Sequence, residues 1–278
     1  MSNETPNKRS NYIIAGGQDG KSRLNVLAEV LYLHTRALLE AKGLLPGMRL
    51  LDVGCGGGNV AMMTARLVGP TGSVTAIDFD REIIALDQQD VVAAGMNNIA
   101  FHAMSAYDIN YDNKFDIVYS RFLLSHLERP LEVLKRMVQS VQPGGKIIVE
   151  DIHFSGHFCY PECKAFDDYV TYFTKAARNN EQDAEIGPRL PGLFRQAGIE
   201  NIGFDVIQPT FNTGKGKWMA YLTLDKIKNT LIEQRIATEE SIVQMLQELE
   251  VFTNDEHTIM SLPRIFRVWG TKISETID

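Results

Sequence analysis

The pattern of apolar positions changes along the chain. Residues 21–42 carry apolar side chains three or four positions apart, which predicts an amphipathic helix. From residue 49 to residue 152, short apolar runs alternate with longer segments of helical period. The predicted strands are 49–54, 73–79, 99–105, 115–121 and 146–152, and the predicted helices are 59–68, 81–94 and 130–140. This alternation is typical of an α/β fold, in which crossover helices cover both faces of a parallel sheet.

The second half of the chain departs from this alternation. Strands are predicted at 201–211 and 263–272, which brings the sheet to seven mostly parallel strands, and the segment 217–253 between them has helical period. Residues 153–185 form another extra segment, rich in aromatic side chains. The chain then divides into an N-terminal arm and helix (1–46), a core (47–152), the aromatic segment (153–185), the end of the core sheet (186–211 and 261–278) and a helical insertion (212–260).

Composition and charge narrow the function. The 278 residues are 44% hydrophobic, enough to bury a full core, and the formal net charge of -7 argues against nucleic acid as a partner. No stretch approaches the roughly 20 apolar residues of a membrane span, and the N-terminus lacks a signal-peptide pattern. The three cysteines, Cys55, Cys159 and Cys163, cannot pair completely, so we expect a reducing, cytoplasmic setting.

A glycine-rich stretch, LDVGCGGGNV at 51–60, follows the first predicted strand. Ligands of open parallel sheets bind beyond the carboxyl ends of the strands, where this stretch lies. A dinucleotide fingerprint starting at Gly54 and Gly56 would need a third glycine at the position of Asn59. The Gly-Lys-Ser/Thr end of a phosphate-binding loop is also missing. Both phosphate-binding interpretations are therefore weakened.

The stretch resembles the first motif of class I S-adenosylmethionine-dependent methyltransferases, an acidic residue followed by alternating glycines. The resemblance implies a Rossmann-like fold and a turn that approaches the amino-acid end and the ribose of the cofactor. That cofactor has an ammonium group and hydroxyls, which need acceptors. The residues of the turn expected to contact it are Asp52, Gly54, Cys55, Gly56 and Asn59.

The ends of the second and third predicted strands extend this resemblance. Asp78, about twenty residues beyond the turn, is placed to accept both ribose hydroxyls, and its alternative role is to cap the helix 81–94. Phe79 would then lie beside the adenine or belong to the core. Related methyltransferases often have an aspartate for the adenine amino group where this chain has Ser105, so the contact falls to that hydroxyl or to the backbone of Ala106.

Two later segments resemble the same family, closest to its ubiquinone and menaquinone C-methyltransferase-like group: FDIVYSRFLLSHL at 115–127 and QPGGKIIVED at 142–151. The first implies that Ser120 and Arg121 lie near the methionine part of the cofactor. Arg121 would hold the carboxylate there, or alternatively form a surface ion pair. The N-terminal YIIAGGQDGKSRL resembles an arm that closes over the cofactor, which would turn Tyr12 and Arg23 toward the site; an inert arm is the alternative.

Methyl transfer from a sulfonium is an in-line displacement, so positioning supplies much of the acceleration. A histidine suits the role of general base, and His126 and His153 follow the fourth and fifth predicted strands. The histidines and cysteines of 153–163 lack the usual zinc spacing, so we expect no metal.

The aromatic segment and the helical insertion predict a lid over a small, largely apolar acceptor; the alternatives are simple hydrophobic packing or a homodimer surface. Two other functions stay open. One is an NAD-type oxidoreductase, and the other is a protein of the same fold that binds the cofactor without transferring methyl groups.

Overall fold

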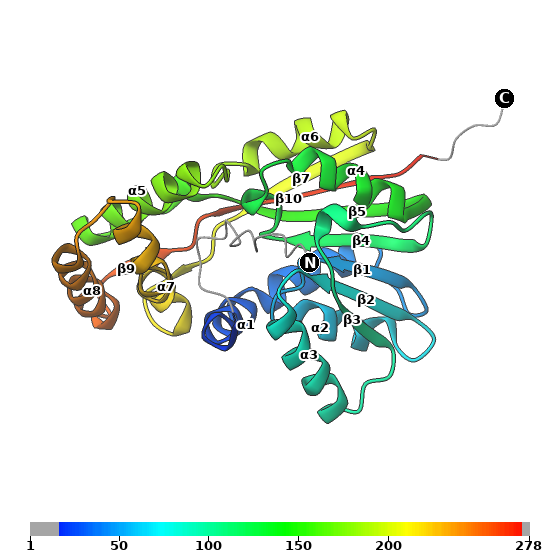
Figure 1. Ribbon diagram of the computed structural model, residues 1–278, viewed down its shortest axis with the longest axis horizontal. Coiled ribbons are helices and arrows are strands. Elements are labelled where there is room, and N and C mark those ends of the chain that lie inside the picture. The colour runs from blue at the N-terminus through cyan, green and yellow to red at the C-terminus, as the bar shows by residue number, and fades with distance from the viewer. Residues whose placement is uncertain (1–16, 274–278) are drawn as a thin grey trace, which may run out of the picture.

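A seven-stranded sheet runs through the middle of the protein in the order β3-β2-β1-β4-β5-β10-β7, in a computed structural model that describes residues 17–273 (Figure 1). The strands β1 to β5 pair in parallel, and β10 lies antiparallel between β5 and β7. The predicted α/β class with a mostly parallel sheet is confirmed. The strands are β1 (Arg49–Val53), β2 (Ser73–Asp78), β3 (Ile99–Ala103), β4 (Phe115–Arg121), β5 (Val141–His153), β7 (Glu200–Ile207) and β10 (Arg264–Thr271).

Helices cover both faces of this sheet (Figure 1). Neighbouring strand positions point to opposite faces, so Leu50 packs in the cluster under α2 while Leu51 packs in the cluster under α4. Both side chains are fully buried. One layer holds α1 (Gly17–Ala41), α2 (Asn59–Val68) and α3 (Arg81–Ala93), and the other holds α4 (Pro130–Ser140) and α6 (Leu190–Gln196).

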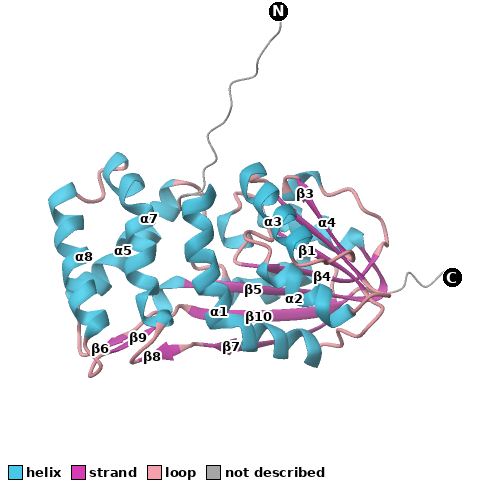
Figure 2. Cartoon of the chain, turned by 90° about the horizontal axis from the view of Figure 1, so that it is seen from below, coloured by secondary structure: helices cyan, strands magenta, loops and turns pink. Residues whose placement is uncertain are grey.

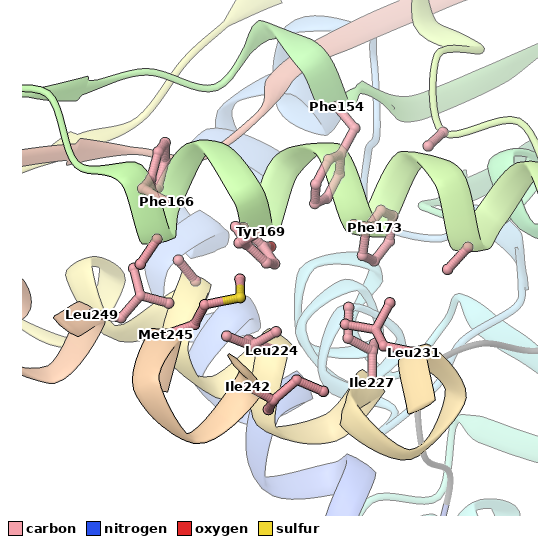
Figure 3. Close-up of a cluster of buried hydrophobic side chains, with 14 of the residues drawn as sticks. Phe154, Phe166, Tyr169, Phe173, Leu224, Ile227, Leu231, Ile242, Met245 and Leu249 are labelled. Carbon is pink, nitrogen blue, oxygen red and sulfur yellow. The ribbon is translucent and has the colours of Figure 1, made fainter. Parts of the chain in front are cut away.

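A second group of elements stands beside the sheet, and we call it the lid (Figure 2). It consists of α5 (Lys164–Asn179), α7 (Met219–Glu233), α8 (Glu239–Asn254) and a three-stranded sheet, β6 (Cys159–Tyr160), β9 (Ile259–Ser261) and β8 (Thr210–Phe211). Aromatic side chains of α5 point toward aliphatic side chains of α7 and α8 (Figure 3). The two extra segments of the sequence therefore share one hydrophobic core. Short 3₁₀ helices lie at Ala106–Asp108 (η1), Leu124–His126 (η2), Phe154–Gly156 (η3), Gly187–Arg189 (η4) and Lys215–Trp218 (η5).

Three boundaries differ from the sequence prediction. The fifth strand begins at Val141 instead of residue 146. The Pro-Gly-Gly run lies inside the strand, where its pairing with β4 shifts register. The predicted strand 201–211 is two strands, since the chain leaves the main sheet before Thr210 and β8 pairs with β9. The helical segment 217–253 breaks between α7 and α8, where Arg235 has a φ of 54° and Thr238 caps the next helix. In the described part of the chain, no helix is long and apolar enough to cross a membrane.

Candidate functional site

The turn between β1 and α2 depends on its glycines. Gly54, Gly56 and Gly58 have φ values of 73°, 51° and 68°, in the left-handed region that other residues rarely adopt. A Cβ on Gly54 would lie 2.9 Å from Leu123, and one on Gly58 would lie 2.9 Å from Phe101. The dense glycines therefore serve both the backbone conformation and the space around the turn.

A cavity of about 500 Å³ begins at this turn and continues under the lid. Its volume lies within the usual range for the binding site of a small molecule. The predicted site residues that line it are Arg23, Asp52, Gly54, Cys55, Gly56, Asn59, Asp78, Phe79, Ser105, Ala106, Arg121 and His126. Ser120 and His153 are not among the lining residues. Tyr12 lies outside the described residues.

Asp52 places a buried carboxylate at the floor of the cavity. Its Oδ2 has no hydrogen-bond partner within residues 17–273. Burial raises the pKa of Asp52 to about 7, although the guanidinium of Arg121 opposes the shift. A buried carboxylate oxygen without a partner is costly unless a ligand satisfies it. The site therefore fits a ligand with a cationic, hydrogen-bonding group.

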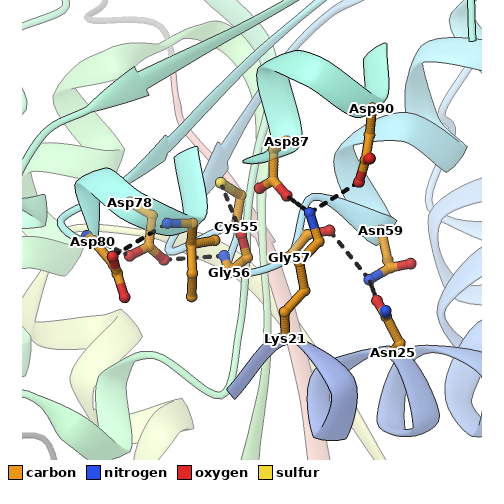
Figure 4. Close-up of polar contacts among 11 residues, drawn as sticks. Lys21, Asn25, Cys55, Gly56, Gly57, Asn59, Asp78, Asp80, Asp87 and Asp90 are labelled. Atoms are coloured by element: carbon orange, nitrogen blue, oxygen red, sulfur yellow. Dashed lines mark hydrogen bonds and ion pairs between the residues drawn. The ribbon is translucent and has the colours of Figure 1, made fainter. Parts of the chain in front are cut away.

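Asp78 holds the glycine turn from the end of β2. Its Oδ2 accepts from the backbone N–H of Gly56 at 3.0 Å, and its Oδ1 accepts from that of Asp80, also at 3.0 Å (Figure 4). Burial raises the pKa of Asp78, and these backbone hydrogen bonds oppose the shift. Asp80 caps α3, accepting from the N–H groups of Glu82 and Ile83. The capping role considered for Asp78 thus belongs to Asp80.

Three residues line the cavity beyond Asp78. Phe79 is exposed, with 53% of its surface accessible, so it offers a face to a ligand and does not belong to the core. The hydroxyl of Ser105 accepts from the backbone N–H of Tyr107 and caps η1, whose first residue is Ala106. The cavity therefore has an apolar wall and short polar groups at the ends of β2 and β3.

Helix α1 is fastened over the glycine turn (Figure 4). The ammonium of Lys21 lies 2.7 Å from a carboxylate oxygen of Asp87. Asn59, the first residue of α2, donates to the side chain of Asn25 at 2.9 Å and to the carbonyl of Gly57 at 3.2 Å. Asn59 thus joins the turn to α1, a role that the sequence did not indicate.

Arg121 belongs to a buried chain of hydrogen bonds. It donates to the hydroxyl of Thr35 at 3.0 Å, and that hydroxyl donates to Glu150 at 2.8 Å. Tyr119 donates to the same carboxylate oxygen at 2.6 Å. The described segment shows no ion pair of Arg121 and so gives no support to the alternative of a surface ion pair. Ser120 is fully buried and lies between Tyr119 and Arg121 on the strand, so its side chain points to the opposite face of the sheet. Its position gives no support to a cofactor contact.

The histidines are arranged differently from the prediction. His126 lines the cavity, and burial lowers its pKa to about 4, with a further contribution from the charge of Arg23. His153 turns away, with its Nε2 3.1 Å from Glu185 and 3.3 Å from the Ser155 hydroxyl. The catalytic role predicted for His153 therefore has no support from the geometry.

His157 lines the cavity in its place. His157 follows the short 3₁₀ turn η3 (Phe154–Gly156), four positions after His153. The aromatic composition around His157 was the only signal of this in the sequence. Across residues 17–273, no three His, Cys, Asp or Glu side chains are grouped as a metal site.

The remaining walls of the cavity are apolar. Phe154, Tyr169 and Phe173 enter it from η3 and α5, and the rings of Phe154 and Phe173 stack with centroids 3.8 Å apart. Aliphatic residues complete this end: Ile152, Met219, Leu262 and Ile265. One cavity thus joins a polar end at the glycine turn to an aromatic end under the lid.

Sequence comparison identifies relatives of this chain. The model of a family described as a methyltransferase domain matches residues 44–208. A demethylmenaquinone methyltransferase of Bacillus mycoides is 36% identical over 188 residues, which are 61% of this chain and 76% of that protein. A second, of Bacillus cytotoxicus, is 35% identical over 41% of this chain and 48% of its own length. A ubiquinone/menaquinone biosynthesis C-methyltransferase of Pseudomonas entomophila is 31% identical over 52% of this chain and 57% of its own length. The chain therefore spans about half to three quarters of the length of these relatives.

Solved structures share the fold. A putative methyltransferase of Bacillus halodurans superposes with a TM-score of 0.58 at 21% identity, covering 86% of this chain and 98% of its own. The phosphoethanolamine N-methyltransferase 2 of Haemonchus contortus, in complex with S-adenosylhomocysteine, superposes with a TM-score of 0.58 at 13% identity. The match covers 91% of this chain and 58% of that protein. The match over 44–208 removes the NAD-type oxidoreductase from consideration. This chain belongs to the class I S-adenosylmethionine-dependent methyltransferases and is similar to their ubiquinone and menaquinone C-methyltransferase group.

Proposed function

We propose that the protein transfers the methyl group of S-adenosylmethionine, by in-line displacement, to an oxygen or carbon atom of a small, largely apolar acceptor. The single observation that carries the proposal is the continuous cavity of about 500 Å³, polar at the glycine turn and aromatic under the lid. A macromolecular acceptor would need an open groove, whereas this cavity is covered by α5 and α7.

The polar end is suited to the groups of the cofactor. Asp52 would accept from the ammonium group, and Arg121 would hold the carboxylate. Asp78 would accept from the ribose hydroxyls, as acidic residues at the end of a second strand do in nucleotide sites. The adenine would lie between Phe79 and the short turn that carries Ser105 and Ala106. The bound cofactor supplies an activated methyl group, and these residues fix its direction.

The aromatic end is suited to orienting the acceptor. Flat rings of Phe154, Tyr169 and Phe173 offer stacking surfaces, and the lid excludes water from the reacting atoms. Holding the two reactants in line accounts for much of the acceleration of such a displacement. Of the two histidines first considered as bases, His126 lines the cavity and His153 does not.

The test is a methyl-transfer screen with labelled S-adenosylmethionine. The panel should hold demethylated quinols, because the relatives carry that name, together with simple phenols, small amines and a peptide. We expect label in an apolar aromatic product, with one S-adenosylhomocysteine formed for each methyl group. If calorimetry detects cofactor binding while no panel member takes the label, the chain would be a cofactor-binding protein with other chemistry.

Binding of S-adenosylmethionine is expected to weaken as the pH falls. The folded pKa of Asp52 is raised to about 7, and only its ionised form pairs with an ammonium group. Lowering the pH from about 8 to about 6 should therefore raise the dissociation constant roughly tenfold. Calorimetry across this range measures the effect. The isosteric Asp52→Asn variant stays neutral, so it should bind weakly at every pH, and a pH slope that survives in it would assign the titration to another group.

A further inference from the structure

His157 is held in one orientation at the aromatic end of the cavity. Its Nδ1 lies 2.7 Å from the backbone carbonyl of Phe154. Its ring also meets those of Phe154, Phe166 and Tyr169 edge-on, with centroids 4.5, 5.8 and 6.0 Å away. Aromatic packing and one hydrogen bond therefore fix both the position and the rotation of the imidazole.

The hydrogen bond also determines where the proton of the ring lies. A carbonyl oxygen only accepts, so Nδ1 must be the donor, and the neutral ring carries its lone pair on Nε2. Burial lowers the pKa of His157 to about 4, so the ring is neutral at physiological pH. Within residues 17–273, the imidazole of His157 makes its side-chain hydrogen bond through Nδ1, to the carbonyl of Phe154. Nε2 is thus a ready acceptor on a side chain that lines the cavity.

A cation, Arg23, lines the same cavity. Arg23 of α1 donates to the hydroxyl of Thr223 on α7 at 3.0 Å. Tyr169, whose ring meets that of His157, is hydrogen-bonded to the same Thr223 and lies in the field of Arg23. In the described part of the chain Arg23 forms no ion pair. A guanidinium without a carboxylate partner, among apolar walls, is suited to a negatively charged oxygen.

These two features complement each other. We propose that the acceptor carries an acidic hydroxyl, that Nε2 of His157 takes the hydroxyl proton, and that Arg23 holds the oxygen from which the proton leaves. This inference rests on the proposed methyl transfer and specifies its acceptor and its base. It also moves Arg23 from the cofactor to the acceptor, since its contacts are with the lid helix α7.

The step balances without another reagent. The O–H bond of the acceptor breaks and its proton passes to Nε2 of His157. The electron pair left on oxygen forms the bond to the methyl carbon. The bond from that carbon to the sulfonium sulfur breaks, and its electrons stay on sulfur, which becomes neutral. The imidazolium then returns its proton to water, for which its low pKa is favourable.

The experiment compares His157→Asn with the native protein on two acceptors. Asparagine can still donate to the Phe154 carbonyl from its amide nitrogen, but it lacks the acceptor at Nε2. With a phenol of hydroxyl pKa about 10, we expect kcat to fall by about 10²- to 10⁴-fold. With a phenol whose electron-withdrawing groups keep it ionised at the assay pH, the loss should be less than about threefold, because general-base catalysis has no proton to remove.

Arg23→Met should affect the ionised phenol more than the protonated one, which is the opposite of the pattern expected for His157→Asn. It should raise KM for the ionised phenol by about 10- to 100-fold, because a charge-assisted hydrogen bond is lost. The matched control is His257→Asn, since the side chain of His257 is 96% exposed on the far part of the lid, and it should leave both acceptors unaffected.

The outcomes separate this inference from the proposed function. Equal losses for both phenols in His157→Asn would assign His157 a structural role and overturn the inference while methyl transfer stands. Native protein that methylates amines but neither phenol would overturn the inference as well. Native protein that methylates nothing on the panel would overturn the proposed function itself.

Discussion

Replacement of Asp78 by alanine is expected to weaken S-adenosylmethionine binding by about 1 to 3 kcal/mol, the usual cost of losing a charged hydrogen-bond partner. The variant loses the acceptor proposed for the ribose hydroxyls. It also frees the backbone N–H groups of Gly56 and Asp80, which the carboxylate holds at 3.0 Å. The glycine turn then loses a contact that orders it before the cofactor arrives. Calorimetry with S-adenosylmethionine and S-adenosylhomocysteine measures the change.

Asp80→Ala separates this effect from a loss of helix stability. Asp80 caps α3 through two backbone N–H groups, so its removal should lower the free energy of unfolding by about 0.5 to 2 kcal/mol. The dissociation constant of the Asp80→Ala variant for S-adenosylmethionine should change less than that of the Asp78→Ala variant. If a folded Asp78→Ala variant binds the cofactor as tightly as the native protein, the ribose lies elsewhere.

The parts that sequence predicted best are those with a local physical cause. The glycine turn could be predicted because positive φ angles restrict the residue type. Three glycines of the turn have φ angles in this left-handed region. The alternation of apolar runs and helical segments predicted the strands β1 to β4 within one or two residues, since the central strands β1 and β4 are buried on both faces. Asp78 lines the cavity, as its place at the end of the second predicted strand indicated, and its contact with the ribose stays a prediction.

The parts that sequence missed depend on contacts between distant segments. His157, just after η3, lines the cavity, whereas His153, four residues earlier, lies beside Glu185. The two lid segments share a core only because α5 packs against α7 and α8, which lie far along the chain. Asn59 binds Asn25 across 34 positions. Apolar periodicity carries no information on such pairings.

Replacement of Phe166 by alanine is expected to lower the free energy of unfolding by about 3 to 5 kcal/mol, as for other large aromatic side chains in a core. Phe166 is 1% exposed and lies on α5 among the side chains of the lid core (Figure 3). Its ring meets that of Tyr169 at 6.1 Å and that of His157 at 5.8 Å. Denaturant unfolding measures the loss as a shift of the midpoint. Tyr160→Ala, at a residue 66% exposed on the neighbouring strand β6, is the control and should change stability by less than about 0.5 kcal/mol.

The effect of Phe166→Ala on function should be confined to the acceptor. Phe166 does not line the cavity, and the residues proposed for the cofactor lie at the glycine turn and the strand ends. The variant should therefore bind S-adenosylmethionine with near-native affinity while its methyl transfer falls, because the rings of Tyr169 and His157 lose their support. If cofactor affinity fell as far as turnover, the lid and the cofactor site would form one cooperative unit. Native turnover in the variant would instead mean that Phe154 and Tyr169 alone hold the imidazole of His157.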